Sequence, residues 1–423
     1  MRKISLLLIF SGFFLFSCRA GAITLDEAID VALKNNFQIL IAQEKVKEAE
    51  EKLKQAQSEF FPSLDLTGSY THLGKIPVMS TPFGDFPMAE QDTTSLTLSL
   101  TQPIYTSGKL TLGLRQAKLN LEKAIYELEN EKSRLAFLVK EAFYSVILAR
   151  ENVDIAEKAL KQAERHLEVV ESFYSSGRAS RFDLLRAKVE VANLKPELIR
   201  AKNNLTVARE NLARLLSLPP SSVEPEEELK FEPLGLTLDE AIDVALSSRK
   251  DLKSLLTAKK IAEIAFELGK IKNTPTLSFL FNYEYETSST KDEWEDSWNA
   301  NLVLSFPLYD FGRKKASTGQ LESQLRQIEL AIKELEEGIK IEVKKAFFDM
   351  KAAAEAISAQ SENVKQAEEA LNIAEGRYKS GIITQLEVLD AALALTKARL
   401  NYTKALYDYS IAEAALMRAM GRW

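Results

Sequence analysis

Cysteine is nearly absent from this sequence of 423 residues, in which Cys18 is the only one. A single thiol excludes an intrachain disulfide, so other interactions must hold the fold together. Long apolar runs are also missing beyond the first residues. No later stretch approaches the roughly 18 consecutive apolar residues of a membrane-spanning helix, and we expect no such helix.

Residue patterns for catalysis are missing as well. The chain has two histidines, His72 and His166, and neither has a set of neighbours suited to binding a metal. We expect both to be plain surface residues. The sequence has no nucleophile elbow, phosphate-binding glycine loop or cysteine–histidine cluster. These absences argue against an enzyme, and we expect no cofactor and no metal.

Long runs of charge of one sign are also missing, and the acidic run Glu226–Glu228 is expected to be plain solvated linker. The 55 Lys and Arg and the 61 Asp and Glu are interspersed, and the formal net charge is −6. No basic patch indicates binding to nucleic acid. Charged residues make up 27% of the chain and hydrophobic residues 46%, which fits helices with one apolar seam and broad solvated faces.

Residues 1–22 are typical of a secretory signal peptide. Two basic residues precede the apolar run Ile4–Phe16, and Ala20-Gly21-Ala22 provides a small-residue cleavage site. The mature chain is then expected to begin near Ile23. An alternative is that the segment ending at Cys18 is a lipoprotein signal with lipidation of that cysteine. Phe16 fits the lipoprotein pattern poorly, so simple removal is favoured.

The rest of the chain is an internal duplication. Thr24–Leu33 recurs unchanged at Thr237–Leu246, where Glu27 and Glu240 complete predicted N-terminal capping boxes. Later landmarks recur 204 positions on: Pro103 and Pro307, Gly108 and Gly312, Gly177 and Gly381. We predict a first repeat over 23–218, a proline-containing solvated linker over 219–236 and a second repeat over 237–423.

Each repeat contains a very long helix, predicted over 109–174 and 313–378. Apolar positions in both follow steps of three and four, which is a coiled-coil seam, with one doubled step of four that locally unwinds the supercoil. At ~1.5 Å per residue each helix would measure roughly 100 Å. Gly177 and Gly381 are expected to end these helices, and return helices are predicted over 181–217 and 385–419. A plain coiled coil is the alternative.

Alternation of apolar and polar residues predicts two strands in each repeat, at about 63–72, 95–105, 276–285 and 298–308. The strand length and the alternation suit a membrane barrel wall with one lipid-facing side. A soluble antiparallel sheet is the alternative. The segments 73–94 and 286–297 are expected to be solvent-facing loops.

Four strands cannot close a membrane barrel, and lipid does not tolerate open sheet edges. The smallest barrels have about eight strands, so we expect a cyclic oligomer, and three copies would supply about twelve. Three copies would also give about twelve helical columns if the shorter helices stack end on end. A ring of that size is a hollow tube.

At this point the sequence resembles the TolC-type outer-membrane factor family over nearly the whole mature chain. The resemblance rests on the duplicated helix–strand–strand–helix order and on these segments: Thr-Leu-Asp-Glu-Ala at Thr24 and Thr237, Pro103–Gly108, Pro307–Gly312 and Arg377–Asp390. It implies a mainly α fold with a small β part. Long antiparallel coiled-coil helices and four antiparallel strands per chain would trimerise into a 12-stranded outer-membrane β-barrel on a periplasmic α-helical barrel.

The resemblance also implies a function. The homotrimer would lie in outer-membrane lipid, extend into the periplasm and serve as a passive exit duct for a tripartite efflux pump or type I secretion. Its partners would be a periplasmic adaptor protein and an inner-membrane pump of RND, ABC or MFS type. A soluble or surface coiled-coil scaffold is the alternative.

Positions at the helix tips take their roles from the same resemblance. Asp183 and Tyr378 would close the periplasmic end, and Glu387 and Asp390 would form an acidic entrance ring. Ile383 stands where the family pattern has an arginine, so Arg178 or Arg181 is expected to replace it. Solvated surface charge is the alternative for these residues. The adaptor would contact the turns at Ser176, Gly177, Ser380 and Gly381.

Overall fold

The structure is a computed structural model, which describes residues 22–220, 223–288 and 291–422. It divides into two compact units. Unit 1 holds residues 1–40, 131–249 and 338–423, and unit 2 holds residues 41–130 and 250–337. Each unit therefore combines segments of both repeats. The predicted signal peptide, with Cys18, lies outside the described residues except for Ala22.

Two short helices of unit 1 open the repeats, α1 (Leu25–Asn35) and α5 (Leu238–Ser248). Thr24 N donates to Glu27 Oε2 at 3.0 Å, and Thr237 N donates to Glu240 Oε2 at 3.1 Å. The reciprocal bonds from the glutamate amides to the threonine side chains complete two capping boxes. The prediction of these N-caps is confirmed, because the box depends only on residues three apart.

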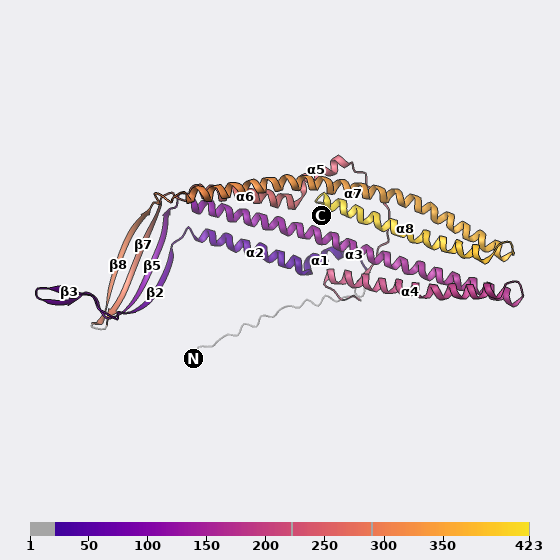
Figure 1. Ribbon diagram of the computed structural model, residues 1–423, viewed down its shortest axis with the longest axis horizontal. Helices are drawn as coiled ribbons and strands as arrows, with labels where there is room; N and C mark the ends of the chain where they lie inside the picture. The colour runs from indigo at the N-terminus through magenta and orange to yellow at the C-terminus, as the bar shows by residue number, and fades with distance from the viewer. Residues whose placement is uncertain (1–21, 221–222, 289–290, 423) are drawn as a thin grey trace. The chain divides into compact units, whose positions relative to one another are not determined.

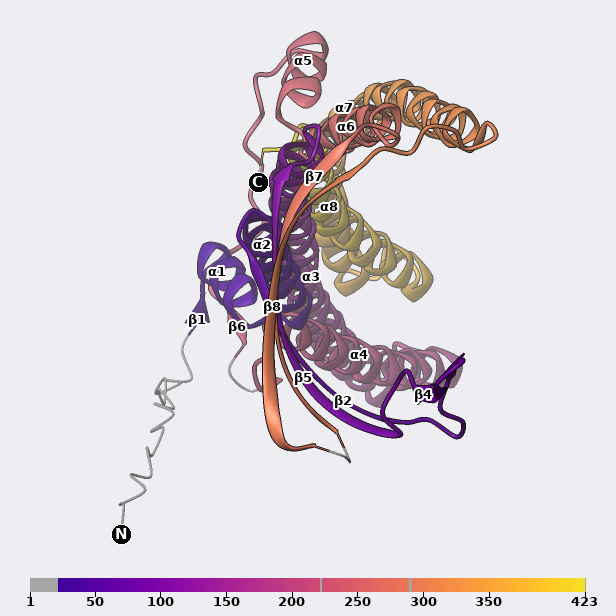
Figure 2. The ribbon, with the colours of Figure 1, turned by 90° about the vertical axis from the view of Figure 1, so that its left-hand side faces the viewer.

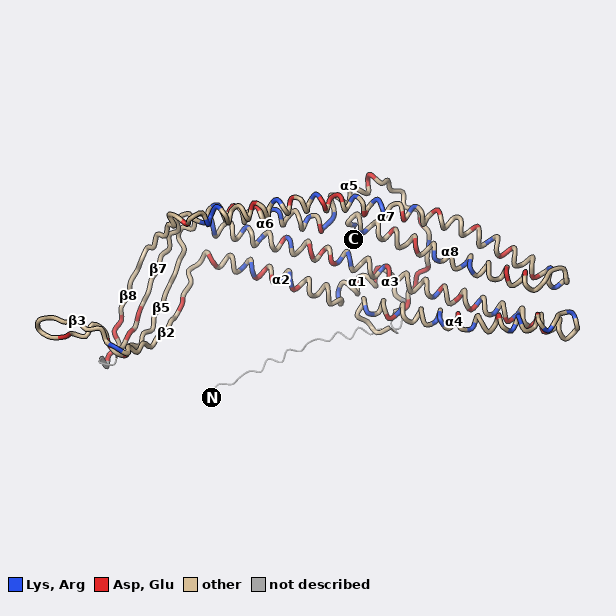
Figure 3. Tube along the Cα trace, in the orientation of Figure 1, with Lys and Arg blue, Asp and Glu red and all other residues tan. Residues whose placement is uncertain are grey.

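The other helices are α2 (Phe37–Ser58), α3 (Lys109–Ser175), α4 (Arg181–Leu216), α6 (Lys250–Lys270), α7 (Arg313–Lys379) and α8 (Gln385–Ala419). Basic and acidic residues are mixed along them (Figure 3). The buried face of α7 follows the predicted seam, at Ile332, Ile339, Val343, Ala346, Met350, Ile357, Ala367, Leu371, Ala374 and Tyr378.

The buried face of α3 is wider than its seam predicts. Seam residues such as Leu135, Val139 and Val146 are buried, but Phe143 and Ile147, which lie off the seam, are buried as well. Other segments of unit 1 cover this second face. The Ser145 and Tyr407 hydroxyls lie 3.1 Å apart across α3 and α8, and Arg150 donates to backbone carbonyls of the linker.

The linker is partly held in place, which corrects the expectation that it is simply solvated. Strand β6 (Glu224–Pro225) pairs in parallel with β1 (Ala22–Ile23). Arg209 forms an ion pair with Glu224 at 2.6 Å, and Leu25 N donates to Glu227 Oε1 at 3.0 Å. Carboxylates that looked like linker charge in the sequence therefore bind groups supplied by distant parts of the chain.

Unit 2 contains an antiparallel sheet in the order β2-β5-β7-β8 (Figure 1). Its strands are β2 (Ser63–His72), β5 (Asp92–Tyr105), β7 (Thr276–Ser288) and β8 (Lys291–Ser305). Both segments that were expected to be solvent-facing loops contain strands, so these two predictions are wrong. The segment 73–94 contains a second hairpin, β3 (Val78–Thr81) and β4 (Gly84–Pro87), and most of 286–297 is strand. Tyr285 stacks on Trp294 across that extension, with ring centroids 4.9 Å apart.

The register aligns the apolar residues of all four strands on one face. Two cross-strand rows on that face are Leu64, Leu100, Phe281, Ala300 and Leu66, Leu98, Tyr283, Trp298. The adjacent rows on the other face are Asp65, Ser99, Asn282, Asn299 and Thr67, Thr97, Glu284, Ser297. Leu64, Leu66, Trp298, Leu302 and Leu304 remain well exposed. Among the described residues, no helix is both long and apolar enough to cross a membrane.

Hydrogen bonds fix the junctions between sheet and helices. Gly108 and Gly312 adopt φ of 83° and 84°, a region that favours glycine. Ser107 Oγ donates to the Pro275 carbonyl at 2.7 Å, and Asn273 Nδ2 donates to Asp310 Oδ2 at 2.9 Å. Residues 273–275, which lead into β7, therefore bind both the segment that follows β5 and the segment that follows β8.

Candidate functional site at the helix tips

The two tips of unit 1 are the turn between α3 and α4 and the turn between α7 and α8. Both turns lie at the same end of their helical hairpins (Figure 1). A shared core, the tip cluster, joins the hairpins; its buried members are Val170, Ala187, Ala367, Leu371, Ala374, Tyr378, Val388, Leu395 and Ala398. Because both hairpins contribute, this end of the unit packs as one body.

The turns at the two tips have the same backbone geometry. Gly177 and Gly381 adopt φ of 73° and 75°. Arg178 N donates to the Phe173 carbonyl at 2.7 Å, and Ile382 N donates to the Arg377 carbonyl at 3.0 Å. Together with the bonds donated by the two glycine amides, these close Schellman motifs. Ser176 Oγ and Ser380 Oγ also donate to helix carbonyls, at 3.0 and 3.1 Å.

Two of the predicted acidic residues act as helix caps within this single chain. Asp183 Oδ2 accepts from Ser180 N at 3.0 Å and from Ser180 Oγ at 2.7 Å. Glu387 Oε1 accepts from Thr384 N at 3.2 Å and from Thr384 Oγ1 at 3.3 Å. Asp390 lies one turn further along α8 and is exposed. The chain alone therefore shows Asp183 and Glu387 in local roles.

Tyr378 is the centre of an aromatic cluster between the hairpins. Its ring centroid lies 5.2 Å from that of His166 and 5.7 Å from that of Phe173. Burial raises the pKa of the Tyr378 phenol, and the charge of Asp183 raises it further. Within this single chain Asp183 makes its hydrogen bonds to Ser180, so a role with Tyr378 in closing the tips stays a prediction.

The two arginines expected to replace the family's partner of Tyr378 lie at the α3–α4 tip. The Arg178 guanidinium lies over the Phe173 ring, 4.3 Å from its centroid, in a cation–π contact. Arg181 is the first residue of α4 and is exposed. Ile383, which occupies the family's arginine position, packs against the tip cluster. At position 383 this chain therefore has an apolar contact, whereas the family pattern implies a charged one.

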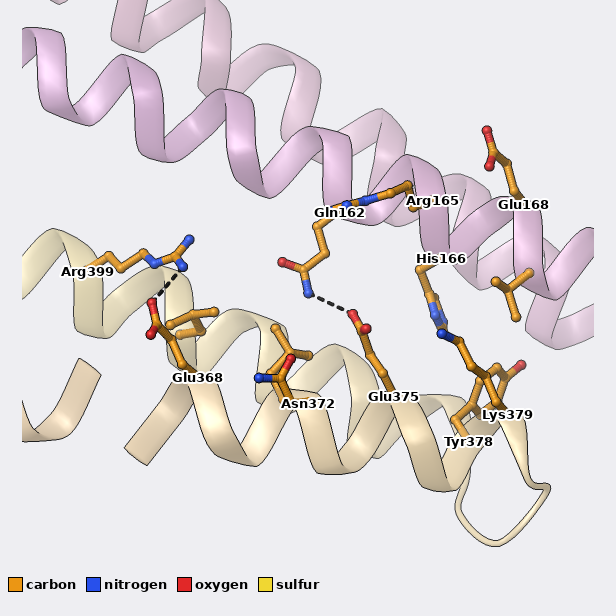
Figure 4. A pocket seen from close by; sticks show the side chains of 13 residues that line it. Gln162, Arg165, His166, Glu168, Glu368, Asn372, Glu375, Tyr378, Lys379 and Arg399 are labelled. Carbon is orange, nitrogen blue, oxygen red and sulfur yellow. Dashed lines mark hydrogen bonds and ion pairs between the residues drawn. The ribbon is translucent and has the colours of Figure 1, made fainter. Parts of the chain in front are cut away.

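A cavity of about 650 Å³ lies beside this aromatic cluster, lined by α3, α7 and α8 (Figure 4). Gln162 Nε2 donates across it to Glu375 Oε1 at 3.0 Å, joining α3 to α7. On its far wall Arg399 binds Glu368 at 2.7 Å. Arg165, Glu168 and Lys379 also line the cavity, so basic and acidic side chains balance there.

His166 projects toward this cavity, so the expectation of a plain surface histidine is wrong. Its Nε2 is buried without a hydrogen-bond partner. Burial lowers the pKa of the His166 imidazole, and the nearby Glu375 carboxylate partly opposes that shift. Gln385, 3% exposed at the start of α8, also has a side chain without a partner. Most buried polar groups are hydrogen-bonded, so two exceptions near one turn are notable.

Sequence reasoning missed both residues because neither position carries a signal. His166 lies next to the seam residue Leu167, and Gln385 follows the predicted N-cap Thr384. Only the contact between hairpins buries them. In the described part of the chain, no three His, Cys, Asp or Glu side chains are grouped so as to hold a metal ion.

Comparisons with known proteins agree with this architecture. A sequence profile of the family described as Outer membrane efflux protein matches residues 28–217 and 241–422, which fall in the two repeats. The outer membrane protein TolC of Vibrio cholerae is 22% identical over 430 residues, covering 100% of this chain and 96% of that protein. The cobalt-zinc-cadmium resistance protein CzcC of Cupriavidus metallidurans is 25% identical over 428 residues, covering 95% and 91%.

A crystal structure has the same fold. The outer membrane protein VceC of Vibrio cholerae superposes with a TM-score of 0.80 at 20% identity, over 94% of this chain and 96% of VceC. A match that covers both proteins almost completely shows that helices, sheet and repeats follow one another in the same way.

Proposed function

The chain belongs to the outer membrane efflux protein family and is an outer-membrane exit channel, and we propose that three copies close its wall. The observation that carries this proposal is the sheet of unit 2. It has one continuous apolar face, one polar face and two edge strands, β2 and β8, within the described residues. Such a sheet is unsuited to water on its apolar side and to lipid at its edges.

Closure by three copies removes both problems. Each unpaired backbone group in hydrocarbon costs several kcal/mol, so open edges do not persist in a membrane. If β8 of one copy pairs with β2 of the next, three copies give a ring of about twelve strands without an edge. The face with Leu66, Tyr283 and Trp298 would then meet lipid, and the face with Thr67, Glu284 and Ser297 would line a water-filled lumen.

A pair of variants tests which face of the sheet meets lipid. Phe281 and Asn282 are neighbours in the middle of β7 and point to opposite faces. An Arg on the lipid face at the bilayer midplane costs about 2–4 kcal/mol, whereas an Arg on the lumen face is solvated. Phe281→Arg should abolish the trimer in outer-membrane extracts, and Asn282→Arg should retain it, measured by native mass in detergent.

Equal behaviour of the two variants would remove the lipid-facing assignment. If the unaltered protein were a water-soluble monomer or elongated dimer, the scaffold alternative would be favoured instead.

The proposed duct has no energy source of its own, and a periplasmic adaptor and an RND, ABC or MFS pump would drive transport through it. We place the adaptor contact at the exposed turns Ser176–Gly177 and Ser380–Gly381.

We further propose that the helix tips form the periplasmic entrance. Asp183 and Tyr378, with Arg178 and Arg181 nearby, are the residues we assign to its closure. Glu387 and Asp390 are three residues apart and exposed on α8. Three copies would bring six carboxylates to the mouth, and rings of acidic side chains favour cations.

Replacement of both ring residues tests this assignment. Glu387→Gln with Asp390→Asn should lower the preference for cations in planar-bilayer recordings, because the ring loses its charge while side-chain size is kept. Glu369→Gln, at an exposed position of α7 away from the turn, is the control. Unchanged ion selectivity in the double variant would exclude the ring.

A further inference from the structure

The β3–β4 hairpin is a ribbon that continues the β2–β5 pair beyond the sheet. Leu73 N donates to the Gln91 carbonyl at 2.7 Å, and Met88 N donates to the Pro77 carbonyl at 2.8 Å. Between these bonds and the turn, Val78 pairs with Pro87 and Thr81 with Gly84. The second repeat has nine fewer residues in the corresponding interval, and its described residues there form only β7 and β8.

The hairpin has a defined shape. Thr81 Oγ1 donates to the Gly84 carbonyl at 2.9 Å, and Phe83 N donates to Thr81 Oγ1 at 3.2 Å. Pro82 occupies the first central position of the turn, where its fixed φ is favourable. Ser80 Oγ also donates to Asp85 Oδ1 across the two strands. The side chains at its end are therefore presented in fixed directions.

Those side chains are apolar and uncovered. Phe83, at the turn, is 92% exposed. Met79, Phe86 and Met88 share one face of the hairpin and are also at least half exposed, whereas Val78 is exposed on the opposite face with Ser80 and Asp85. Single exposed apolar residues are ordinary, but a contiguous apolar patch on an ordered element marks an interaction site. The ribbon from 73 to 91 carries only Lys75, Asp85 and Glu90 as charged residues, so copies of it repel one another weakly.

We propose that the hairpins of three copies pack on one another at the channel axis and cover its outer mouth. This inference rests on the proposed trimer. Figure 2 shows the sheet as a curved band with the hairpin turned toward its concave side. The axis of a closed barrel lies on the concave side of its wall, so the partner that each hairpin meets there is another copy of itself.

The dimensions allow this contact. Twelve strands spaced ~4.8 Å apart and tilted by ~40° make a ring with a radius of roughly 12 Å. The ribbon from Leu73 to Pro82 is ten residues long, which at ~3.3 Å per residue gives a reach of roughly 33 Å. A ribbon rooted at the rim therefore reaches the axis even when it leaves the wall obliquely. Threefold symmetry would bring three Phe83 side chains together.

Cysteine cross-linking tests the contact in the full-length trimer. A disulfide requires two Cα atoms within about 7 Å, which three Phe83 positions at the axis satisfy and three rim positions do not. Phe83→Cys should give a chain dimer on a denaturing, non-reducing gel after mild oxidation. Lys75→Cys, near the base of the ribbon, should stay monomeric under the same treatment. The unaltered chain is the blank, because its only cysteine, Cys18, lies in the predicted signal peptide.

Access to the lumen provides a second readout that does not depend on the periplasmic end. Ser99 lies on the polar face of β5, so a Ser99→Cys variant carries a thiol inside the proposed lumen. Adding Phe83→Asp and Phe86→Asp should make the three hairpins repel one another. The labelling rate of that thiol by a bulky maleimide added outside the cell should then rise several-fold. Lys75→Asp, at an exposed position near the base of the ribbon, changes the charge of each chain by the same amount and should leave the rate unchanged.

The outcomes separate the two proposals. A native trimer in which Phe83→Cys forms no disulfide and the Asp variants leave labelling unchanged overturns the cover but leaves the channel intact. Quenching of a fluorophore on Phe83→Cys by brominated lipid would place the hairpin in the membrane and would also overturn it. Loss of the trimer in the unaltered protein would instead contradict the proposed function.

Discussion

The two helix tips occupy equivalent positions in the two repeats and differ in their surroundings. Tyr174 and Tyr378 lie 204 positions apart, each three residues before its turn glycine. Tyr378 is 8% exposed in the tip cluster, whereas Tyr174 is 42% exposed. The turns themselves match closely in backbone geometry. The duplicated tips therefore share their local structure. Packing between the hairpins buries the tyrosine of only one of them, Tyr378.

Replacing the two tyrosines should expose this asymmetry most strongly. Truncating a large buried aromatic side chain costs roughly 3–5 kcal/mol, and an exposed one far less. Tyr378→Ala should lower the local opening free energy of the tips by about 3 kcal/mol, measured by hydrogen exchange of peptides that cover 160–175 and 370–390. Tyr174→Ala is the matched control. Similar losses in both variants would show that the assembled protein buries both tyrosines.

The two turn glycines should behave alike, in contrast to the two tyrosines, because each is required only by the backbone angles of its own turn. An L-residue with left-handed backbone angles costs roughly 1–2 kcal/mol. Gly177→Ala and Gly381→Ala should therefore destabilise their own turns by similar amounts, measured by exchange of the amides in each turn. No added Cβ would meet another atom within 4 Å at either position. A large difference between the two variants would point to contacts beyond the backbone.

The capping carboxylates should give a smaller and unequal effect. Loss of an N-terminal cap typically costs about 1 kcal/mol. Asp183 makes shorter bonds to its cap residue than Glu387 does. Asp183→Ala should thus fray the first turn of α4 more than Glu387→Ala frays that of α8, read from exchange at both helix starts. The reverse order would show that Glu387 has a stronger partner in the trimer.

Acid should loosen the tips slightly, through a residue that has no counterpart in the other repeat. His166 is replaced by Ala370 at the equivalent position. Burial holds the pKa of His166 below its ordinary value of 6.5, so the packed state favours the neutral ring. As the pH falls below that value, protonation is less costly in the open state, and stability of the closed tips is lost.

The slope of the local opening free energy between pH 7.5 and 5.5 measures this linkage. It should be shallower in His166→Gln, which keeps a polar side chain of similar reach and does not titrate. The other charged groups that line the cavity (Arg165, Glu168, Glu368, Glu375, Lys379 and Arg399) are the same in both proteins. An unchanged slope would assign the pH dependence to one of them.

Much of the fold was predictable because its signals are local. The threonine caps of α1 and α5, the glycine turns and the seam of α7 each depend on residues within a few turns of helix. The alternation along the strands likewise predicted which residues share a face. The candidate site was less predictable. The family pattern supplied Asp183 and Tyr378, but not the arrangement of Arg178 on Phe173, the apolar packing of Ile383 or the burial of His166.

The sequence by itself determined the repeats, the long helices, their ends and the two-faced strands, because periodicity and turn residues act through the backbone nearby. Only the tertiary structure decided which of two equivalent tyrosines is buried, why α3 has a second buried face, and that an expected loop holds an apolar hairpin. Burial depends on what lies against a residue, and segments far apart in the chain supply that neighbour. Equivalent positions of the two repeats can therefore come to lie in different surroundings.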